Sequence, residues 1–232
     1  MKKKTPQHGD IPFSNEPPNE LQIGLAITQE PRCACLILAD CSGSMFGNPI
    51  AELNAGLQQL KAMLLEDQLA CLRVELALVA FNEQVSVKVD FCPPDQFNPP
   101  ALDAAGGTML GAALLQGLSM LKARIAEYSN AGNNFYRPWL ICLTDGKPSD
   151  DISEAARQIK EAEAKKRVAF FGVGVQGANM ADLGSISLRP PLQLEGLKFT
   201  ELFEWLSVNL SSVADSRPGD QVALTPPGWS AV

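Results

Sequence analysis

Short apolar runs alternate with amphipathic stretches along this chain, and this alternation limits its fold more than any other feature. The apolar runs predict buried strands at 33–39, 72–81, 139–144, 168–175 and 192–194. Apolar residues that recur every three or four positions predict helices at 49–65, 108–127, 152–165 and 199–213. This order predicts an α/β fold: a doubly wound, Rossmann-like, mainly parallel central sheet with helices on both faces.

One further strand breaks the parallel pattern. Residues 84–91 alternate Val or Phe with polar side chains, so one face of this strand is expected to meet solvent. Only Asn82 and Glu83 separate it from the preceding strand, which is the length of a hairpin turn. We therefore expect one antiparallel edge strand.

The two ends of the chain differ from its middle. Eight of the 17 prolines lie in residues 1–31 and 214–232, and proline favours extended or irregular backbone. We therefore expect one folded domain at 32–213. A flexible Pro-rich N-terminal segment at 1–31 would precede it, and a flexible C-terminal tail at 214–232 would follow it.

Charge and hydropathy argue against two classes of partner. The chain has 19 Lys and Arg against 26 Asp and Glu, which gives a formal net charge of −7. Nucleic-acid binding depends on basic surface, and the sequence contains no extended basic stripe. No apolar run approaches the roughly 20 residues that span a bilayer. We expect neither nucleic acid nor a membrane as a partner.

Histidine and cysteine usage narrows the chemistry further. The single histidine, His8, lies in the Pro-rich N-terminal segment, so Ser-His-Asp and Cys-His catalysis are not expected. The six cysteines form no Cys-x-x-Cys pair, and several lie in or beside apolar runs. Polar residues follow the initial MKKK, where a signal peptide would be apolar. We therefore expect free thiols and a cytoplasmic location.

Three loops that follow or precede the predicted elements carry oxygen-bearing side chains. In a parallel sheet, ligands bind beyond the carboxyl ends of the strands, so these loops are expected to meet at one edge. The loops contain Asp40-Cys41-Ser42-Gly43-Ser44, Gly106-Gly107-Thr108 and Thr144-Asp145-Gly146-Lys147. If the first loop stays extended, its alternate spacing directs three side chains toward one place.

These loops suit a hard divalent cation. Asp40, Ser42, Ser44 and Thr108 offer four oxygen atoms, with Asp145 as a direct or water-mediated fifth ligand. Mg²⁺ prefers about six oxygen ligands. We therefore predict a site for one divalent cation, with Mg²⁺ favoured and Mn²⁺ or Ca²⁺ as alternatives.

Each loop feature also has a purely structural interpretation. Thr108 alone is typical of a helix N-cap, and Asp145 alone is typical of a turn. Asp150 and Asp151 are expected to cap the helix that starts near Ile152 rather than to bind the ion. The joint occurrence of the hydroxyl and carboxyl groups at three loops is what favours the metal interpretation.

The pattern LILADCSGSM, followed by GGT and LTDG, resembles the von Willebrand factor A (vWA) domain and its metal ion-dependent adhesion site. That family motif is Asp-x-Ser-x-Ser, then a distant Thr and a distant Asp. It is matched in full by Asp40, Ser42, Ser44, Thr108 and Asp145. The resemblance covers about residues 32–213 and implies the vWA fold. It also implies that Thr108 ligates the ion in the partner-bound form and moves away in the resting form.

The amino-acid sequence at 42–57 and 143–150 is similar to that of the bacterial TerY branch of the family, which is associated with tellurium resistance. That resemblance implies a cytoplasmic, metal-dependent protein-binding module in a stress or signalling system. It also implies action beside protein kinases and PP2C-type phosphatases.

A protein partner is expected to donate an Asp or Glu carboxylate to the ion. The predicted rim for that partner contains Met45, Phe46, Gly107 and Lys147. We do not expect an enzyme. A Mg²⁺-dependent hydrolase or phosphatase is the alternative, but two-metal hydrolysis needs more carboxylates than these loops offer. A nucleotide-binding role is disfavoured because neither GxxxxGK[ST] nor GxGxxG is present.

Overall fold

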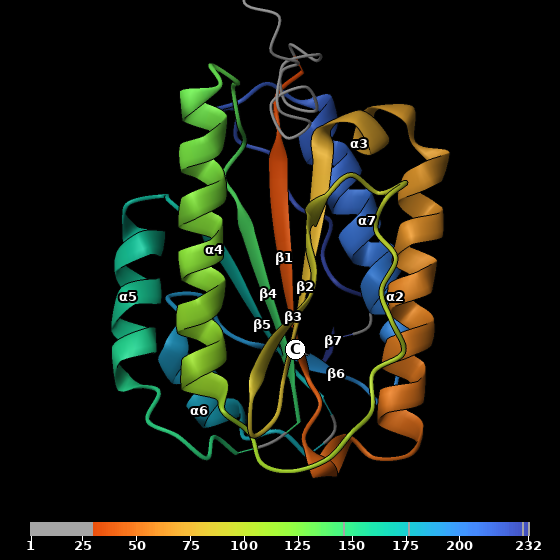
Figure 1. The fold of residues 1–232 in the computed structure, drawn as a ribbon, viewed down its shortest axis with the longest axis vertical. Helices are drawn as coiled ribbons and strands as arrows, with labels where there is room; N and C mark the ends of the chain where they lie inside the picture. The colour runs from red at the N-terminus through yellow and green to blue at the C-terminus, as the bar shows by residue number, and fades with distance from the viewer. Residues whose placement is uncertain (1–29, 146, 176, 229, 232) are drawn as a thin grey trace, which may run out of the picture.

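Seven strands form one sheet in the order β3-β2-β1-β4-β5-β6-β7 (Figure 1). The structure is a computed structural model that describes residues 30–145, 147–175, 177–228 and 230–231. The strands are β1 (Cys33–Asp40), β2 (Val74–Phe81), β3 (Val85–Cys92), β4 (Trp139–Thr144), β5 (Ala169–Gly174), β6 (Leu192–Leu194) and β7 (Ser230–Ala231). Each of the predicted strands is therefore present.

The pairing confirms the doubly wound α/β fold. Strands β2, β1, β4, β5 and β6 pair in parallel, and β3 pairs antiparallel to β2 at one edge, as expected. At the other edge, the two-residue strand β7 pairs antiparallel to β6, so the sheet has a second antiparallel edge strand that the sequence did not indicate. Chain connectivity reverses direction beside β1, where ligands bind in open α/β sheets.

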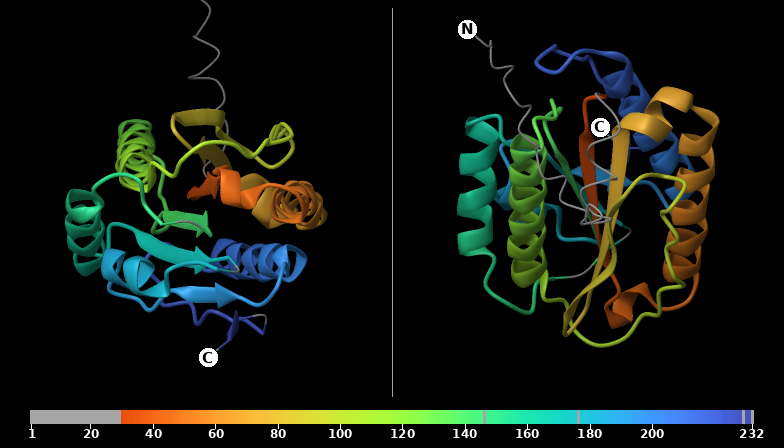
Figure 2. Two further views of the ribbon diagram at one scale, coloured as in Figure 1. Left: turned by 90° about the horizontal axis from the view of Figure 1, so that it is seen from below. Right: turned by 45° about the horizontal axis from the view of Figure 1, so that its top comes forward.

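Helices cover both faces of the sheet (Figure 2). They are α2 (Asn48–Glu66), α3 (Gln68–Arg73), α4 (Leu110–Asn130), α5 (Ser153–Ala164), α6 (Met180–Ile186) and α7 (Phe199–Asp215), and a short 3-10 helix η1 spans Gly43–Met45. A hydrophobic core lies on each face of the sheet, and alternate residues of β1 point into one core or the other. Cys35 and Ile37 pack with residues of α2 and α7. Leu36 and Leu38 pack with residues of α4, α5 and α6 on the other face. Within the described residues, no helix combines the length and apolar character needed to cross a bilayer.

The strand predicted from residue 72 starts two residues later because a helix precedes it. The Asp67 carboxylate accepts hydrogen bonds from the amides of Leu69 and Ala70 at 2.9 and 3.0 Å. This cap starts the six-residue helix α3, which ends at Arg73. The apolar run predicted as a strand includes Leu72 and Arg73, the last two residues of α3, so the helix was not recognised from the sequence.

The expectation of a flexible C-terminal tail at 214–232 is corrected by the contacts of its described part. The Trp205 indole N–H donates to the carbonyl of Thr225 at 2.6 Å. The Thr225 amide donates to Oδ1 of Asn209 at 2.8 Å. Val222 and Leu224 pack against the core on the α2 and α7 face. Hydrogen bonds to Trp205 and Asn209 and the apolar contacts of Val222 and Leu224 thus hold this segment against the domain, and none of them is indicated by the local sequence.

Most of the predicted N-terminal segment, residues 1–29, lies outside the described residues. Its last part is held by contacts to the domain. Glu30 forms an ion pair with Arg73, with 2.6 Å between Oε2 and Nη2. The Arg32 amide donates to the carbonyl of Asn134 at 2.9 Å, just before β1 begins.

Candidate metal centre

The loops that follow β1, β3 and β4 meet at the carboxyl edge of the parallel strands. Backbone hydrogen bonds join the first two loops: the Gly43 amide donates to the Gly106 carbonyl at 2.9 Å, and the Ala105 amide donates to the Cys41 carbonyl at 2.9 Å. Gly106 has a positive φ of 78°, a conformation that favours glycine. The expected convergence of the loops is therefore present.

Asp40, the last residue of β1, supplies a fully buried carboxylate at this edge. Its Oδ1 accepts a hydrogen bond from the Ser42 amide at 2.7 Å. Its Oδ2 accepts a hydrogen bond from the hydroxyl of Thr144 at the end of the neighbouring strand β4. From the sequence, Thr144 was placed at the end of a strand and at the start of the third loop, but it was not predicted as a partner of Asp40. Its place directly before Asp145, at the end of a strand adjacent to β1, was the available signal.

The side chains of Ser42, Ser44 and Asp145 form a connected chain of contacts. The two serine Oγ atoms lie 3.1 Å apart, and the Ser44 hydroxyl donates to Oδ1 of Asp145 at 2.7 Å. The first loop does not stay extended, as the alternate spacing had assumed. Instead, the 3-10 helix η1 turns Ser44 back beside Ser42, so the convergence has a different backbone cause.

Two carboxylates, those of Asp40 and Asp145, lie near each other at this edge, and their negative charges interact. Burial raises the pKa of Asp145, the hydrogen bond from Ser44 opposes the rise, and the negative charge of Asp40 adds to it. Within the described part of the chain, no three His, Cys, Asp or Glu side chains are grouped so that they could hold a metal ion. A cation at this edge would therefore depend on hydroxyl ligands as well as carboxylates.

Thr108 lies at the same edge but is held differently. It is buried, and its amide donates to the Ser149 hydroxyl at 2.9 Å. The Ser149 amide donates to the Thr108 carbonyl at 2.8 Å. Both contacts use the backbone of Thr108 and join its loop to the loop that carries Asp145. Helix α4 begins at Leu110, so Thr108 is not the N-cap that its sequence position suggested.

The prediction that Asp150 caps the helix starting near Ile152 is wrong. Its carboxylate instead accepts hydrogen bonds from the amides of Gly111 and Ala112, at 3.0 and 2.8 Å, and so caps α4 from another loop. Asp151 does contact the start of α5, because its Oδ1 accepts a hydrogen bond from the Ser153 amide at 2.9 Å, although the N-cap position itself is occupied by Ile152. Sequence reasoning assigned both caps to the nearest helix, as no local signal identifies a distant one.

The predicted partner rim is only partly exposed. Met45 is completely buried, because η1 turns its side chain into the core, so it is removed from the rim. Phe46 is 78% exposed, Gly107 is half-buried and Lys147 is exposed. Cys41 is buried, and burial followed by the charge of Asp40 raises the pKa of its thiol to about 11, which agrees with a packing role.

The sequence profile of the von Willebrand factor type A domain matches residues 36–202. The chain belongs to the von Willebrand factor type A domain family. A stretch of 61 residues of this vWA chain is 41% identical to the mouse (Mus musculus) collagen alpha-5(VI) chain, and it covers 26% of this chain and 2% of the collagen chain.

Solved structures share the fold at low identity. A von Willebrand factor type A structure from Catenulispora acidiphila matches with a TM-score of 0.58 at 19% identity, over 79% of this vWA chain and 43% of that chain. The pilus adhesin SpaC from Lactobacillus rhamnosus GG matches with a TM-score of 0.63 at 15% identity, over 79% and 31%. Proximal thread matrix protein 1 from the mussel byssus, described with a zinc-occupied MIDAS motif, matches with a TM-score of 0.54 at 16% identity, over 78% and 48%. The vWA chain thus spans less than half the length of these proteins.

Domains of the vWA family are generally non-enzymatic modules for adhesion or protein interaction, and many depend on a divalent metal. The low identity of the solved structures extends only the fold to this chain.

Proposed function

We propose that this protein is a metal-dependent protein-binding module whose ion is held by Asp40, Ser42, Ser44, Thr108 and Asp145. The observation that carries the proposal is the connected side-chain network at the sheet edge. Ser44 Oγ lies 3.1 Å from Ser42 Oγ and 2.7 Å from Asp145 Oδ1, and Asp40 is fixed at the end of β1 by the Ser42 amide. The order of these residues also matches the family motif.

The donor set fits a hard divalent cation. All five side chains offer oxygen atoms, which Mg²⁺, Mn²⁺ and Ca²⁺ prefer. Two of the five side chains, Asp40 and Asp145, are carboxylates. Burial and the negative charge of Asp40 raise the pKa of Asp145, so a cation that offsets these negative charges would be favoured at this edge. Mg²⁺ is our choice among these cations. When bound, such an ion supplies a Lewis-acidic position for one further oxygen ligand.

We infer that the further ligand is an Asp or Glu carboxylate from a protein partner. The exposed Phe46 provides an apolar contact beside the site, and Lys147 and the Gly107 backbone complete the rim. The chain itself is acidic, with a net charge of −7. Long-range charge therefore does not attract an acidic partner, so the attraction must come from the ion at short range.

The finer assignment follows the sequence resemblance. We propose a TerY-like role in a bacterial cytoplasmic stress or signalling system, together with a protein kinase and a phosphatase. The sequence similarity at 42–57 and 143–150 supports this assignment. We propose no catalytic residue, because the edge offers hydroxyl groups and two carboxylates but none of the additional carboxylates that two-metal hydrolysis uses.

The test is capture of partners by the immobilised full chain with Mg²⁺, with EDTA, and with EDTA followed by excess Mg²⁺ or Mn²⁺. A partner should be captured with Mg²⁺, lost in EDTA and recovered after metal is restored. Its binding should change only modestly between low and moderate salt. Binding that persists unchanged in EDTA would contradict the proposal. Phosphatase and ATPase assays with Mg²⁺ test the hydrolase alternative, for which we expect no activity.

A further inference from the structure

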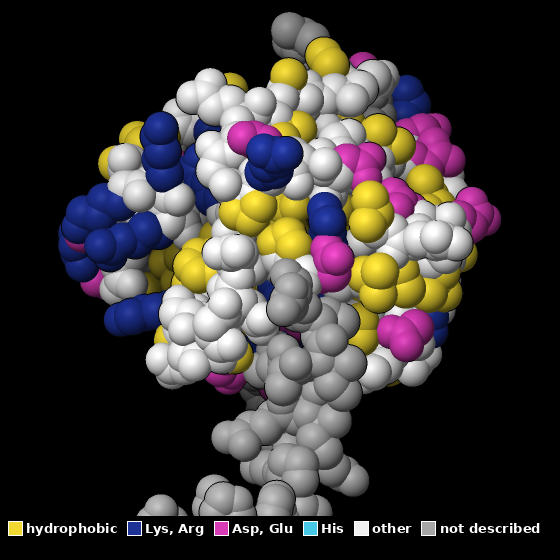
Figure 3. All heavy atoms as spheres, turned by 90° about the horizontal axis from the view of Figure 1, so that it is seen from above, with side chains coloured by type: hydrophobic (Ala, Val, Ile, Leu, Met, Phe, Trp, Pro, Cys, Tyr) yellow, Lys and Arg dark blue, Asp and Glu magenta, His cyan; other side chains and the backbone are white. Residues whose placement is uncertain are grey.

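A large open groove lies at the end of the sheet opposite the candidate metal centre (Figure 3). Its volume is about 1270 Å³, which exceeds the roughly 300–1,000 Å³ of ordinary small-molecule pockets. Trp139 and Ala169, the first residues of β4 and β5, line it, so it lies at the amino ends of the parallel strands. Helices α4 and α5 form one wall, and residues 219–224 contribute to the other. The groove has the size of a site for a peptide segment.

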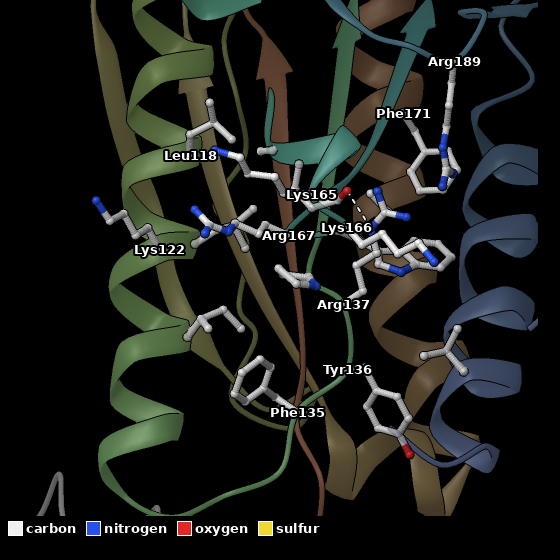
Figure 4. Close-up of a pocket in the computed structure, with 18 of the residues that line it drawn as sticks. Leu118, Lys122, Phe135, Tyr136, Arg137, Lys165, Lys166, Arg167, Phe171 and Arg189 are labelled. Atoms are coloured by element: carbon white, nitrogen blue, oxygen red, sulfur yellow. Dashed lines mark hydrogen bonds between the residues drawn. The ribbon is translucent and has the colours of Figure 1, made fainter. Parts of the chain in front are cut away.

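The groove is basic although the chain as a whole is acidic. Seven Lys or Arg side chains line it, against the two acidic residues Glu161 and Asp220. The view into the groove includes Lys122, Arg137, Lys165, Lys166, Arg167 and Arg189 (Figure 4). In a chain of net charge −7, this clustering makes the groove the part of the surface suited to an acidic ligand.

Ion pairs within the described residues neutralise only part of this positive charge. Glu161 is shared between Arg157 and Lys165, and the buried Glu163 lies 3.6 Å from Arg189. Arg137 donates to the backbone carbonyl of Val168 at 2.6 Å, a neutral acceptor. Burial lowers the pKa of Arg137, and the positive charge of the nearby Arg189 lowers it further.

Apolar side chains line the groove between these cations. They include Leu118 and Ile125 from α4, Phe135 before β4, Phe171 of β5, and Leu224 from the C-terminal segment. Nucleic acid would offer phosphates but no aliphatic side chains for these surfaces. The lining instead matches a protein segment that carries both acidic and aliphatic residues.

The chain contains such a segment in residues 10–29, which lie outside the described residues. This stretch has three acidic residues, Asp10, Glu16 and Glu20, and no Lys or Arg. Four large aliphatic residues then alternate with smaller or polar ones, at Leu21, Ile23, Leu25 and Ile27. Side chains at alternate positions of an extended chain share one face, so in an extended conformation these four would form an apolar row next to the acidic stretch.

The described part of the chain begins at Glu30, which pairs with Arg73, and two residues later it runs beside the wall of this groove. The Arg32 amide donates to the Asn134 carbonyl at 2.9 Å, and the Tyr136 amide donates to the Arg32 carbonyl at 2.8 Å. Phe135 and Tyr136 both line the groove. A segment tethered this closely has an effective concentration on the order of millimolar. Twenty residues reach roughly 60 Å when extended, which is ample to cross the groove.

We propose that residues 10–29 of this chain bind in the basic groove, with the aliphatic row against Leu118, Phe135 and Phe171 and the acidic residues beside the cations. The groove is then an intramolecular peptide-binding site, separate from the metal centre and independent of the proposed function.

The first test is zero-length carbodiimide cross-linking of the full chain, read by mass spectrometry. We expect Asp10, Glu16 and Glu20 to be linked to Lys122, Lys165 and Lys166 at least fivefold more often than to the control lysines. Lys88 on β3 and Lys198 before α7 are exposed lysines outside the groove and serve as those controls. Even distribution over all lysines would overturn the proposal. A mixture of isotope-labelled and unlabelled chains checks the occupant, because links between different chains would assign the groove to a second copy and overturn it.

The second test uses charge reversal at exposed positions. In the double variant Lys166→Glu/Arg167→Glu, links to Lys122 and Lys165 should fall at least fivefold, and amide exchange in residues 20–29 should accelerate. The control Lys88→Glu should change neither. Adding Glu16→Lys/Glu20→Lys to the double variant should restore slow exchange, since the charge pairs are then re-formed with opposite sign. Slow exchange that is unaffected by the double variant would place the segment elsewhere and overturn the proposal.

Discussion

The Asp150 carboxylate accepts a hydrogen bond from the Gly111 amide at 3.0 Å, although 39 residues separate them in the chain. The contact joins the loop after β4 to the first turn of α4. The reciprocal pair between Thr108 and Ser149 lies in the same two loops. Two of the three loops of the candidate metal centre are therefore held together by contacts that use no proposed metal ligand side chain.

We expect Asp150→Ala to lower both stability and metal affinity. Loss of an N-cap costs about 0.5–2 kcal/mol, which corresponds to roughly 1–8 °C in Tm for a chain of this size. Because the loop of Thr108 loses support, Mg²⁺ affinity should fall about tenfold. Thermal melting and calorimetry measure the two effects. Asp151→Ala, which removes the hydrogen bond to the first amide of α5, is the matched control and should leave Mg²⁺ affinity unchanged.

We expect Asp40→Asn to abolish most metal binding while the domain stays folded. The amide keeps the size of the side chain and an oxygen that can accept from the Ser42 amide. It removes the one fully buried carboxylate of the site. Mg²⁺ or Mn²⁺ affinity should fall by more than about a hundredfold, beyond the effect of changing an outer contact. Calorimetry checks this, with Asp90→Asn on β3 as control. Unchanged affinity would exclude Asp40 as a ligand.

We expect Thr108→Ala to weaken partner binding more than metal binding. The family resemblance implies that this residue ligates the ion in the partner-bound form, and its described hydrogen bonds use the backbone, which the substitution keeps. Thr108→Ser retains the hydroxyl and should bind as the parent chain does. The measurements are Mg²⁺ calorimetry and titration of the partner captured in the EDTA-sensitive experiment. Equal losses in both would indicate a static site.

We expect removal of residues 218–232 to destabilise the domain. The deletion takes away the amide of Thr225, which donates to the fully buried Asn209, and the carbonyl that accepts from Trp205. Leaving buried polar groups unpaired costs about 1–3 kcal/mol, so Tm should fall by roughly 2–12 °C. Truncation after Gly228 keeps Thr225 and should cost less. Equal melting of both truncations and the parent chain would show that the segment adds no stability.

We expect Cys92 to react slowly with alkylating reagents at neutral pH. Burial, followed by the charge of Glu75, raises the pKa of its thiol to about 11. Because the thiolate is the reactive form, the rate of iodoacetamide labelling should rise about tenfold per pH unit between pH 8 and 10. Peptide mass spectrometry resolves this site from the other cysteines. A labelling rate that levels off below pH 9 would contradict the raised pKa.

Six strands and the four longest helices were predicted from the sequence with small shifts of their ends, whereas the short helices α3 and α6 and the two-residue strand β7 were not. Local periodicity determines them, as in the alternation of 84–91 that identified β3. The fold class and the convergence of three polar loops follow from the same pattern, because the carboxyl ends of parallel strands meet at one edge. The candidate ligands could therefore be named before any coordinates.

Contacts between distant segments were decided only by the tertiary structure. The Asp150 cap on α4 and the anchoring of Thr225 on Asn209 each join residues whose local sequence carries no sign of the partner. Hydrogen bonding satisfies whichever polar group the fold brings near, whereas periodicity records only which face of an element is buried. The sequence by itself therefore determined the layers and the oxygen-rich edge, and the tertiary structure decided how the loops of that edge are held.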